Sequence, residues 1–177
     1  MEFNYSRESR EGSIAVDMFD EKAELTVEPL SPDYRTLPIT EGFDWPKIID
    51  DIARTRELGS EKLYLVVFRS IRKYEADETL AAELDAFVTQ LDDAAHTEAK
   101  SSSELLHYFT DKLDEEGRAM SWCLWTERTA ARQALSGPAH QLAVRHAPDL
   151  YEDSTIEAYD VHLFEDREVV FDLKYKH

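Results

Sequence analysis

The chain has 177 residues, of which 42% are hydrophobic, so it is long and apolar enough for one domain with a buried core. Its 38 Asp and Glu outnumber 20 Lys and Arg, and the resulting net charge of −18 excludes nucleic acid as an expected partner, because such a surface repels phosphate backbones. This excess of acids is explained either by an acidic solvated surface or by a halophilic adaptation, in which high salt screens the self-repulsion.

Features of membrane, secreted and cofactor-binding proteins are missing from the sequence. No stretch approaches the roughly 20 continuous apolar residues of a membrane span, and residues 1–8 contain no apolar signal region. Cys123 is the single cysteine, which rules out an internal disulfide and a multi-cysteine metal site. Five glycines supply few phosphate-cradling loops. We therefore expect a cytoplasmic protein with no membrane contact, no metal and no cofactor.

Residues 1–60 are predicted to form an N-terminal extension that packs on a core domain of residues 61–177. Two runs in which apolar residues alternate with small or polar ones predict a β-hairpin within residues 14–27. Residues 29–44 contain three prolines and a glycine, so they are expected to form an irregular connector.

A short helix and the strongest strand of the chain come next. Asp44 is predicted to cap the helix, and Pro46 lies in its first turn, where the missing N–H costs nothing. The apolar face of this helix holds Ile48, Ile49, Ile52 and Ala53. Residues 62–69 are nearly all β-branched or aromatic, which predicts a strand that is buried on both faces.

The remaining pattern alternates helical and extended periods. In chain order it predicts a long helix capped by Asp77, strands over residues 105–109 and 119–125, an alanine-rich helix capped by Thr126 and broken at Gly137, a second helical segment to about Ala147, and strands over residues 155–164 and 169–175. The order β-α-β-β-α-β is that of the ferredoxin-like fold. We therefore predict an α+β protein with an antiparallel sheet, helices on one face, the N-terminal extension and an extra C-terminal strand.

The predicted sheet has one face that its own helices leave bare. Apolar residues occupy both parities of the strand over residues 62–69, so both faces must be buried. The bare face is covered either by a second copy of the chain, which gives a homodimer, or by residues 13–60.

A run from Ser121 to Ala131, followed by Pro138, Ala139 and His140, resembles the dimeric α+β barrel superfamily, which includes antibiotic-biosynthesis-monooxygenase-like and stress-responsive barrel proteins. The shared features are a strand ending in Trp, a Ser/Thr-acid cap, an alanine-rich helix and a histidine after its break. Ala134 stands where haem-degrading members carry a second Trp, and residues 62–69 contain no Asn, so haem degradation is disfavoured.

The resemblance implies a small apolar or aromatic ligand between sheet and helices. The protein would be a cofactor-independent monooxygenase or an isomerase-like enzyme; the alternative is a non-catalytic ligand-binding or stress-related protein of the same fold.

Two histidines are the candidate catalytic residues. His140 lies near the N-terminus of the second helical segment, where it could act as a general base or bind a backbone carbonyl at the helix break. His107 lies on a strand whose alternation places it with Leu105 and Phe109, and it could meet His140 or His162.

Four further residues are the candidate ligand contacts. Trp122 and Trp125 lie on opposite faces of one strand, where they could stack on a flat ligand or simply fill the core. Arg69 could bind a carboxylate or phosphate, or pair with one of the many acids. Tyr151 is implied by the resemblance alone.

Overall fold

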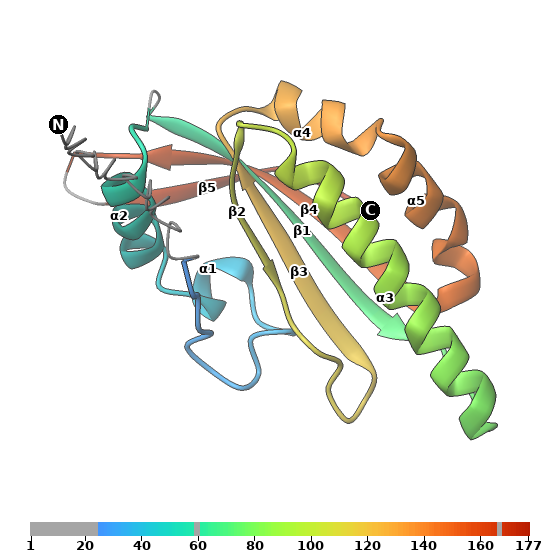
Figure 1. Cartoon of the computed structure of the whole chain (residues 1–177). Coiled ribbons are helices and arrows are strands. Elements are labelled where there is room, and N and C mark those ends of the chain that lie inside the picture. Colours follow the sequence, from blue (N-terminus) through green and yellow to red (C-terminus); the bar gives the residue numbers. More distant parts are fainter. Residues whose placement is uncertain (1–24, 59–60, 166–167) are drawn as a thin grey trace, which may run out of the picture.

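The computed structural model describes residues 25–58, 61–165 and 168–177 (Figure 1). In chain order, the elements within these residues are α1 (Ile39–Gly42), α2 (Trp45–Thr55), β1 (Lys62–Arg72), α3 (Glu78–Lys100), β2 (Leu105–Thr110), β3 (Arg118–Trp125), α4 (Arg128–Leu135), α5 (Pro138–Leu150), β4 (Tyr151–Leu163) and β5 (Val169–Lys176). The strands form a single sheet in the order β2-β3-β1-β4-β5, and each neighbouring pair is antiparallel.

The path from β1 to β4 is ferredoxin-like, with β1 and β3 adjacent at the centre of the sheet. Helices α3, α4 and α5 all lie on one face, which we call the inner face (Figure 1). β5 extends the sheet beyond β4 as the extra C-terminal strand. The predicted α+β fold class, with helices on one face of an antiparallel sheet, is confirmed.

Two helices begin where aspartates were predicted to cap them. The Asp77 carboxylate accepts hydrogen bonds from the backbone N–H groups of Thr79 and Leu80 at the start of α3. The Asp44 carboxylate accepts one from the backbone N–H of Lys47 at the start of α2. Among the described helices, none combines the length and apolarity that a membrane span requires.

The start of α4 differs from the prediction. Its N-cap is Glu127, whose side chain makes no capping hydrogen bond, so the predicted cap by Thr126 is wrong. The Thr126 hydroxyl donates instead to the carboxylate of Glu104, which precedes β2. The side chain that could have capped α4 thus ties β3 to the neighbouring strand.

The predicted hairpin within residues 14–27 lies largely outside the described residues. Its described end, Leu25 and Val27, is not part of a strand. Both side chains pack against the core on the sheet face opposite the helices, which we call the outer face. The N-terminal segment therefore reaches the sheet as a covering layer.

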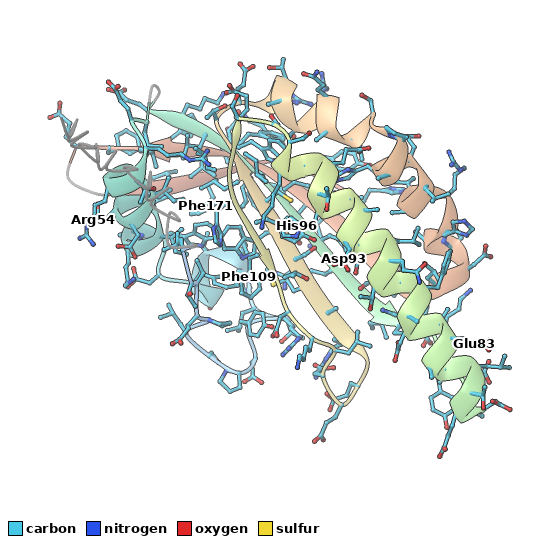
Figure 2. All side chains as sticks on the ribbon, in the orientation of Figure 1. Arg54, Glu83, Asp93, His96, Phe109 and Phe171 are labelled. Carbon is cyan, nitrogen blue, oxygen red and sulfur yellow. The ribbon has the colours of Figure 1, made fainter. Side chains whose placement is uncertain are left out.

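Residues 25–58 cover the outer face (Figure 1). Trp122 lies near the middle of this packing, with ring centroids 5.6 Å from Phe43, 5.0 Å from Trp45 and 5.5 Å from Phe109. Phe109 and Phe171 lie toward α1 and α2 (Figure 2). The buried residues of the cover are Tyr34, Ile39, Phe43, Trp45, Ile48, Ile49 and Ile52. Burial of so many large apolar side chains stabilises the layer through the hydrophobic effect.

Polar contacts fix the register of the cover on the sheet. The Arg69 guanidinium, from β1, donates hydrogen bonds to the backbone carbonyls of Arg35 and, at 2.8 Å, Leu37. At the β2 edge of the sheet, the Tyr34 hydroxyl donates to the Asp111 carboxylate, and Arg35 Nη2 lies 2.6 Å from an oxygen of the same group. Arg69 therefore anchors the N-terminal layer.

Of the two predicted covers of the outer face, the structure has the one supplied by the same chain. A second copy is not needed there, because the apolar residues of β1 on this side are already buried. The homodimer stays a prediction, as does a domain boundary at residue 60.

Candidate ligand-binding site

The helices seal only part of the inner face. At the end of the sheet nearest α4, Tyr64 of β1 and Trp125 of β3 are directly paired and are 7% and 2% exposed. They pack against small side chains, namely Ala99 of α3 with Ala130 and Ala131 of α4. Alanines let these helices approach the sheet closely, so this end is filled by protein.

Farther along the same strands, several side chains that face the helices are only half-buried. We call this group the inner strip, and its members are Val66, Phe68, Tyr108, Ser121, Cys123 and Tyr151. Their neighbours on the outer face are fully buried, for example Leu65 and Val67 at 0% exposure. Central strands are usually buried on both faces. The partial exposure of these side chains therefore means that solvent reaches part of the sheet beneath the helices.

Strand pairing places the strip residues next to each other. Cys123 is paired with Val66 on one side and with Tyr108 on the other. Phe68 is paired with Ser121, and its ring centroid lies 5.5 Å from that of Tyr151. The strip therefore combines an apolar surface, three aromatic rings and hydroxyl groups.

Ionisable groups from α3 and β1 border the strip. His96 of α3 stacks on Tyr108 with ring centroids 4.1 Å apart, between the helix and the sheet (Figure 2). Burial raises the pKa of the Asp92 carboxyl, and the Arg72 guanidinium opposes that shift. Arg72 also lies 5.7 Å from the centroid of the Tyr151 ring.

The strip environment keeps its own titratable groups neutral. Burial raises the pKa of the Cys123 thiol to about 12. Burial raises the pKa of Tyr151 to about 12 as well, with the Asp92 charge adding to the effect. It also raises the pKa of Tyr108. Because the charged forms are disfavoured, the strip presents neutral hydroxyl and thiol groups near pH 7.

His140 lies outside the strip, at the contact between α3 and α5. Its Nδ1 atom is 3.0 Å from the Glu98 carboxylate, which also accepts a hydrogen bond from the backbone N–H of Ala139. Glu98 therefore caps the N-terminus of α5 from a neighbouring helix. Gly137 permits this approach, because a Cβ there would lie 2.0 Å from Glu98 Oε1. The arrangement holds α5 against α3.

His107 faces the outer side of the sheet. Its ring centroid is 5.2 Å from that of Trp122, in the layer covered by residues 25–58. An irregularity in the β2–β3 pairing between Leu105 and His107 changes the alternation, so His107 does not share a face with Leu105 as predicted. The sheet separates His107 from His140, and the two do not form one site.

Of the predicted ligand contacts, only Tyr151 belongs to the inner strip. Trp122 and Trp125 lie on opposite faces as predicted, but they are 1% and 2% exposed and pack within the two cores. Arg69 is directed to the N-terminal cover and lies 3.8 Å from Glu157. Of the other predicted site residues, the structure brings together only His107 and Trp122, within the outer core and away from the inner strip.

The sequence contained a partial signal for the residues that were missed. The parity that places Tyr64 inward also places Val66 and Phe68 inward, and a serine at position 121 is unusual between apolar strand residues. Asp92 could not have been found, because nothing in the sequence distinguishes it from the other acids of α3.

One group of side chains has metal-ligand chemistry. Single ligand atoms of Asp160, His162 and Asp172 lie within 4.8 Å of one another on β4 and β5. Two lysines already form ion pairs with Asp160, whose carboxylate is 2.8 Å from the Lys62 ammonium and 3.6 Å from that of Lys174. A divalent ion would have to displace both, so we assign no metal to this group.

Comparisons with known proteins place the chain in a family and add likeness in fold. A family model described as PB2B2.08-like matches residues 14–174. No curated protein matches the chain. The chain is also similar to several solved structures.

Three solved structures illustrate that likeness. Rv0793 from Mycobacterium tuberculosis is 12% identical with a TM-score of 0.45, over 54% of this chain and 91% of its own. The protein NE2512 from Nitrosomonas europaea is 14% identical with a TM-score of 0.44, over 58% and 91%. SnoaB, a cofactor-independent oxygenase from Streptomyces nogalater, is 14% identical with a TM-score of 0.41, over 60% and 96%.

Proposed function

The chain belongs to the PB2B2.08-like family, and we propose that it binds a small apolar or aromatic ligand on the inner strip, between α3, α5 and the sheet. The observation that carries this proposal is the partial exposure of the strip, whose residues lie on central strands and yet are reached by solvent. Apolar and aromatic side chains that stay partly exposed on central strands form a candidate surface for a ligand.

The chemistry of the strip selects the kind of ligand. Phe68 and Tyr151 offer ring surfaces for a ligand, whereas Tyr108 already stacks on His96. The hydroxyls of Tyr108 and Ser121 are hydrogen-bonded to each other and can share one further hydrogen bond with a ligand. A charged ligand would lose its hydration beside groups that are themselves neutral, which costs free energy. A neutral aromatic molecule with one polar substituent fits these side chains best.

Binding without catalysis is better supported than turnover by the predicted residues. His140 is held by Glu98, and His107 lies on the other side of the sheet. Neither histidine is therefore positioned to act on a ligand at the strip. This favours the ligand-binding alternative among the functions that the resemblance implies.

An isomerase-like or oxygenase-like activity is the second candidate, and one observation favours it. Asp92 is a carboxyl near enough to the strip for its charge to act on Tyr108 and Tyr151, and a carboxyl in that position is a candidate general base. In that case Asp92→Asn would abolish turnover of a ligand while leaving its affinity nearly unchanged. If Asp92→Asn has no effect on turnover, this candidate fails and the binding proposal stands.

Cys123 provides a direct test, because the only cysteine of the chain lies in the strip. We would measure the rate at which N-ethylmaleimide alkylates Cys123 at pH 8, with increasing 1-naphthol as the probe. A bound aromatic molecule covers the thiol, so the rate is expected to fall saturably. An unchanged rate at concentrations where calorimetry shows saturation would contradict the proposed site.

Two tryptophan variants provide the controls. Ser121→Trp fills the strip and should abolish the binding of 1-naphthol measured by calorimetry. Gln90→Trp adds the same side chain to the exposed surface of α3 and should leave the affinity within about two-fold. Equal affinities for the two variants would show that the strip is not where the probe binds.

A further inference from the structure

A second recess lies at the end of the sheet where β1 begins and β3 ends. This cleft has a volume of about 690 Å³, within the range of small-molecule sites. It shares no residue with the inner strip. Its apolar wall includes Leu63 and Leu106, from the edge of the outer core, and Tyr64, from the inner core.

Most charged groups that line the cleft already have partners. The Lys62 ammonium is 2.8 Å from the Asp160 carboxylate. Arg56 donates a hydrogen bond of 2.6 Å to the backbone carbonyl of Leu105 and thereby closes the edge of β2. These cations are committed to the fold, so they are not the groups that would recognise a ligand.

Arg128 differs from the other cations of the cleft. It is exposed at the start of α4, and its guanidinium carbon lies 5.9 Å from the centroid of the Tyr64 ring. Among the described residues, none forms a hydrogen bond or an ion pair with it. Three further acids line the cleft, Glu57, Glu104 and Glu127, and all three are exposed, so solvent and salt weaken their effect on the cleft.

We propose that this cleft binds an amphipathic molecule carrying one carboxylate. The carboxylate pairs with the planar guanidinium of Arg128, which can donate two parallel hydrogen bonds to it. The apolar part lies against Leu58, Leu63 and Leu106, at the end of the sheet. Because the chain as a whole carries −18 and repels anions, a preference for a carboxylate reports a local site and not a general attraction.

Octanoate and 1-octanol form a matched pair of probes, since they share the apolar chain and differ in charge. Calorimetric titration of the full chain at low ionic strength should show tighter binding of octanoate. Arg128→Gln is expected to weaken octanoate binding about ten-fold, because charge-assisted hydrogen bonds are among the strong ones. Binding of 1-octanol should change by less than about two-fold, and Arg128→Lys should retain part of the preference because it keeps the charge.

Arg132→Gln is the matched control, since Arg132 is exposed one turn farther along α4 and does not line the cleft. It should leave octanoate affinity within about two-fold. Equal losses from Arg128→Gln and Arg132→Gln, or no loss from Arg128→Gln, would overturn the proposal. The proposal would also be overturned if octanoate protected Cys123 from alkylation, because the probe would then lie on the inner strip. Failure of the inner-strip proposal alone leaves these expected outcomes unchanged.

Discussion

Cys123 shows how the environment of a single residue controls its chemistry. Its pKa of about 12 leaves roughly one molecule in 10⁵ as thiolate at pH 7, although solvent reaches the side chain. We therefore expect the native thiol to react slowly with a disulfide reagent and its rate to rise about ten-fold per pH unit up to pH 9 without levelling off. In urea the rate should level off near the ordinary thiol pKa, about 8.5. Levelling off in the native protein below pH 9 would contradict the burial of this thiol.

Glu98 gives a second prediction at the residue scale. The backbone N–H of Ala139, and then His140, lower the pKa of Glu98 below its ordinary value near 4.5. A carboxyl with a lowered folded-state pKa contributes stability that is present above the unfolded pKa and is lost as pH falls through the folded pKa. The stability difference between the native chain and Glu98→Gln, from urea unfolding, should therefore be present at pH 7 and shrink below about pH 4. A difference independent of pH would show that Glu98 is not charged in this role.

Gly137 tests the same contact from the other side. A Cβ at this position would lie 2.0 Å from the Glu98 carboxylate, so Gly137→Ala must push that group away from the start of α5. We expect Gly137→Ala to lower the urea midpoint and to remove the pH-dependent advantage that Glu98 gives. Gly117 is not a suitable control, because its positive φ of 74° strains any replacement; Ser136→Ala, next to Gly137, is suitable and should leave the pH dependence intact.

At the scale of elements, Arg69 connects β1 to the N-terminal cover. Its guanidinium satisfies backbone carbonyls at Arg35 and Leu37 that would otherwise be poorly hydrated. Arg69→Met keeps much of the side-chain volume and removes these hydrogen bonds, so we expect a loss of about 2–3 kcal/mol in the free energy of unfolding. Arg54→Met, which removes an exposed arginine whose ion pair within the described part of the chain is with Asp51, should cost less than about 1 kcal/mol. Equal costs would mean that Arg69 does not anchor the cover.

The elements were predictable to the extent that local signals determine them. Asp44 and Asp77 cap helices as expected, and the alternation of β1 and β3 gives the correct faces for Leu65 and Trp122. Longer-range contacts decided the rest. The Thr126 hydroxyl, just after β3, donates a hydrogen bond to the carboxylate of Glu104, just before the neighbouring β2, and does not cap α4. No local pattern in the sequence encodes that choice.

The candidate site was less predictable than the fold, for two physical reasons. A bulge is invisible to strict alternation, so His107 was correctly grouped with Phe109 but wrongly grouped with Leu105. The length of contact between α3 and the sheet depends on tertiary packing, so the half-exposed strip around Ser121 and Cys123 could not be located from sequence. Large aromatic residues such as Trp125 were predicted to contact a ligand, but they fill the core.

At the scale of the whole molecule, the N-terminal layer decides how the fold is completed. A sheet with helices on one face must bury its other face, and here the same chain supplies the cover. The cover leaves the inner face as the side on which a ligand would bind, beneath α3 and α5. Any dimer must then form through surfaces that the cover leaves free.

Tryptophan fluorescence tests this arrangement most directly, because all three tryptophans of the chain are buried, Trp45 as part of the cover and Trp122 beneath it. We would measure acrylamide quenching of the native protein from nanomolar to high micromolar concentration. If residues 25–58 shield the outer face, quenching stays weak and independent of concentration. If a second copy is what shields it, quenching rises as the protein is diluted and its copies separate.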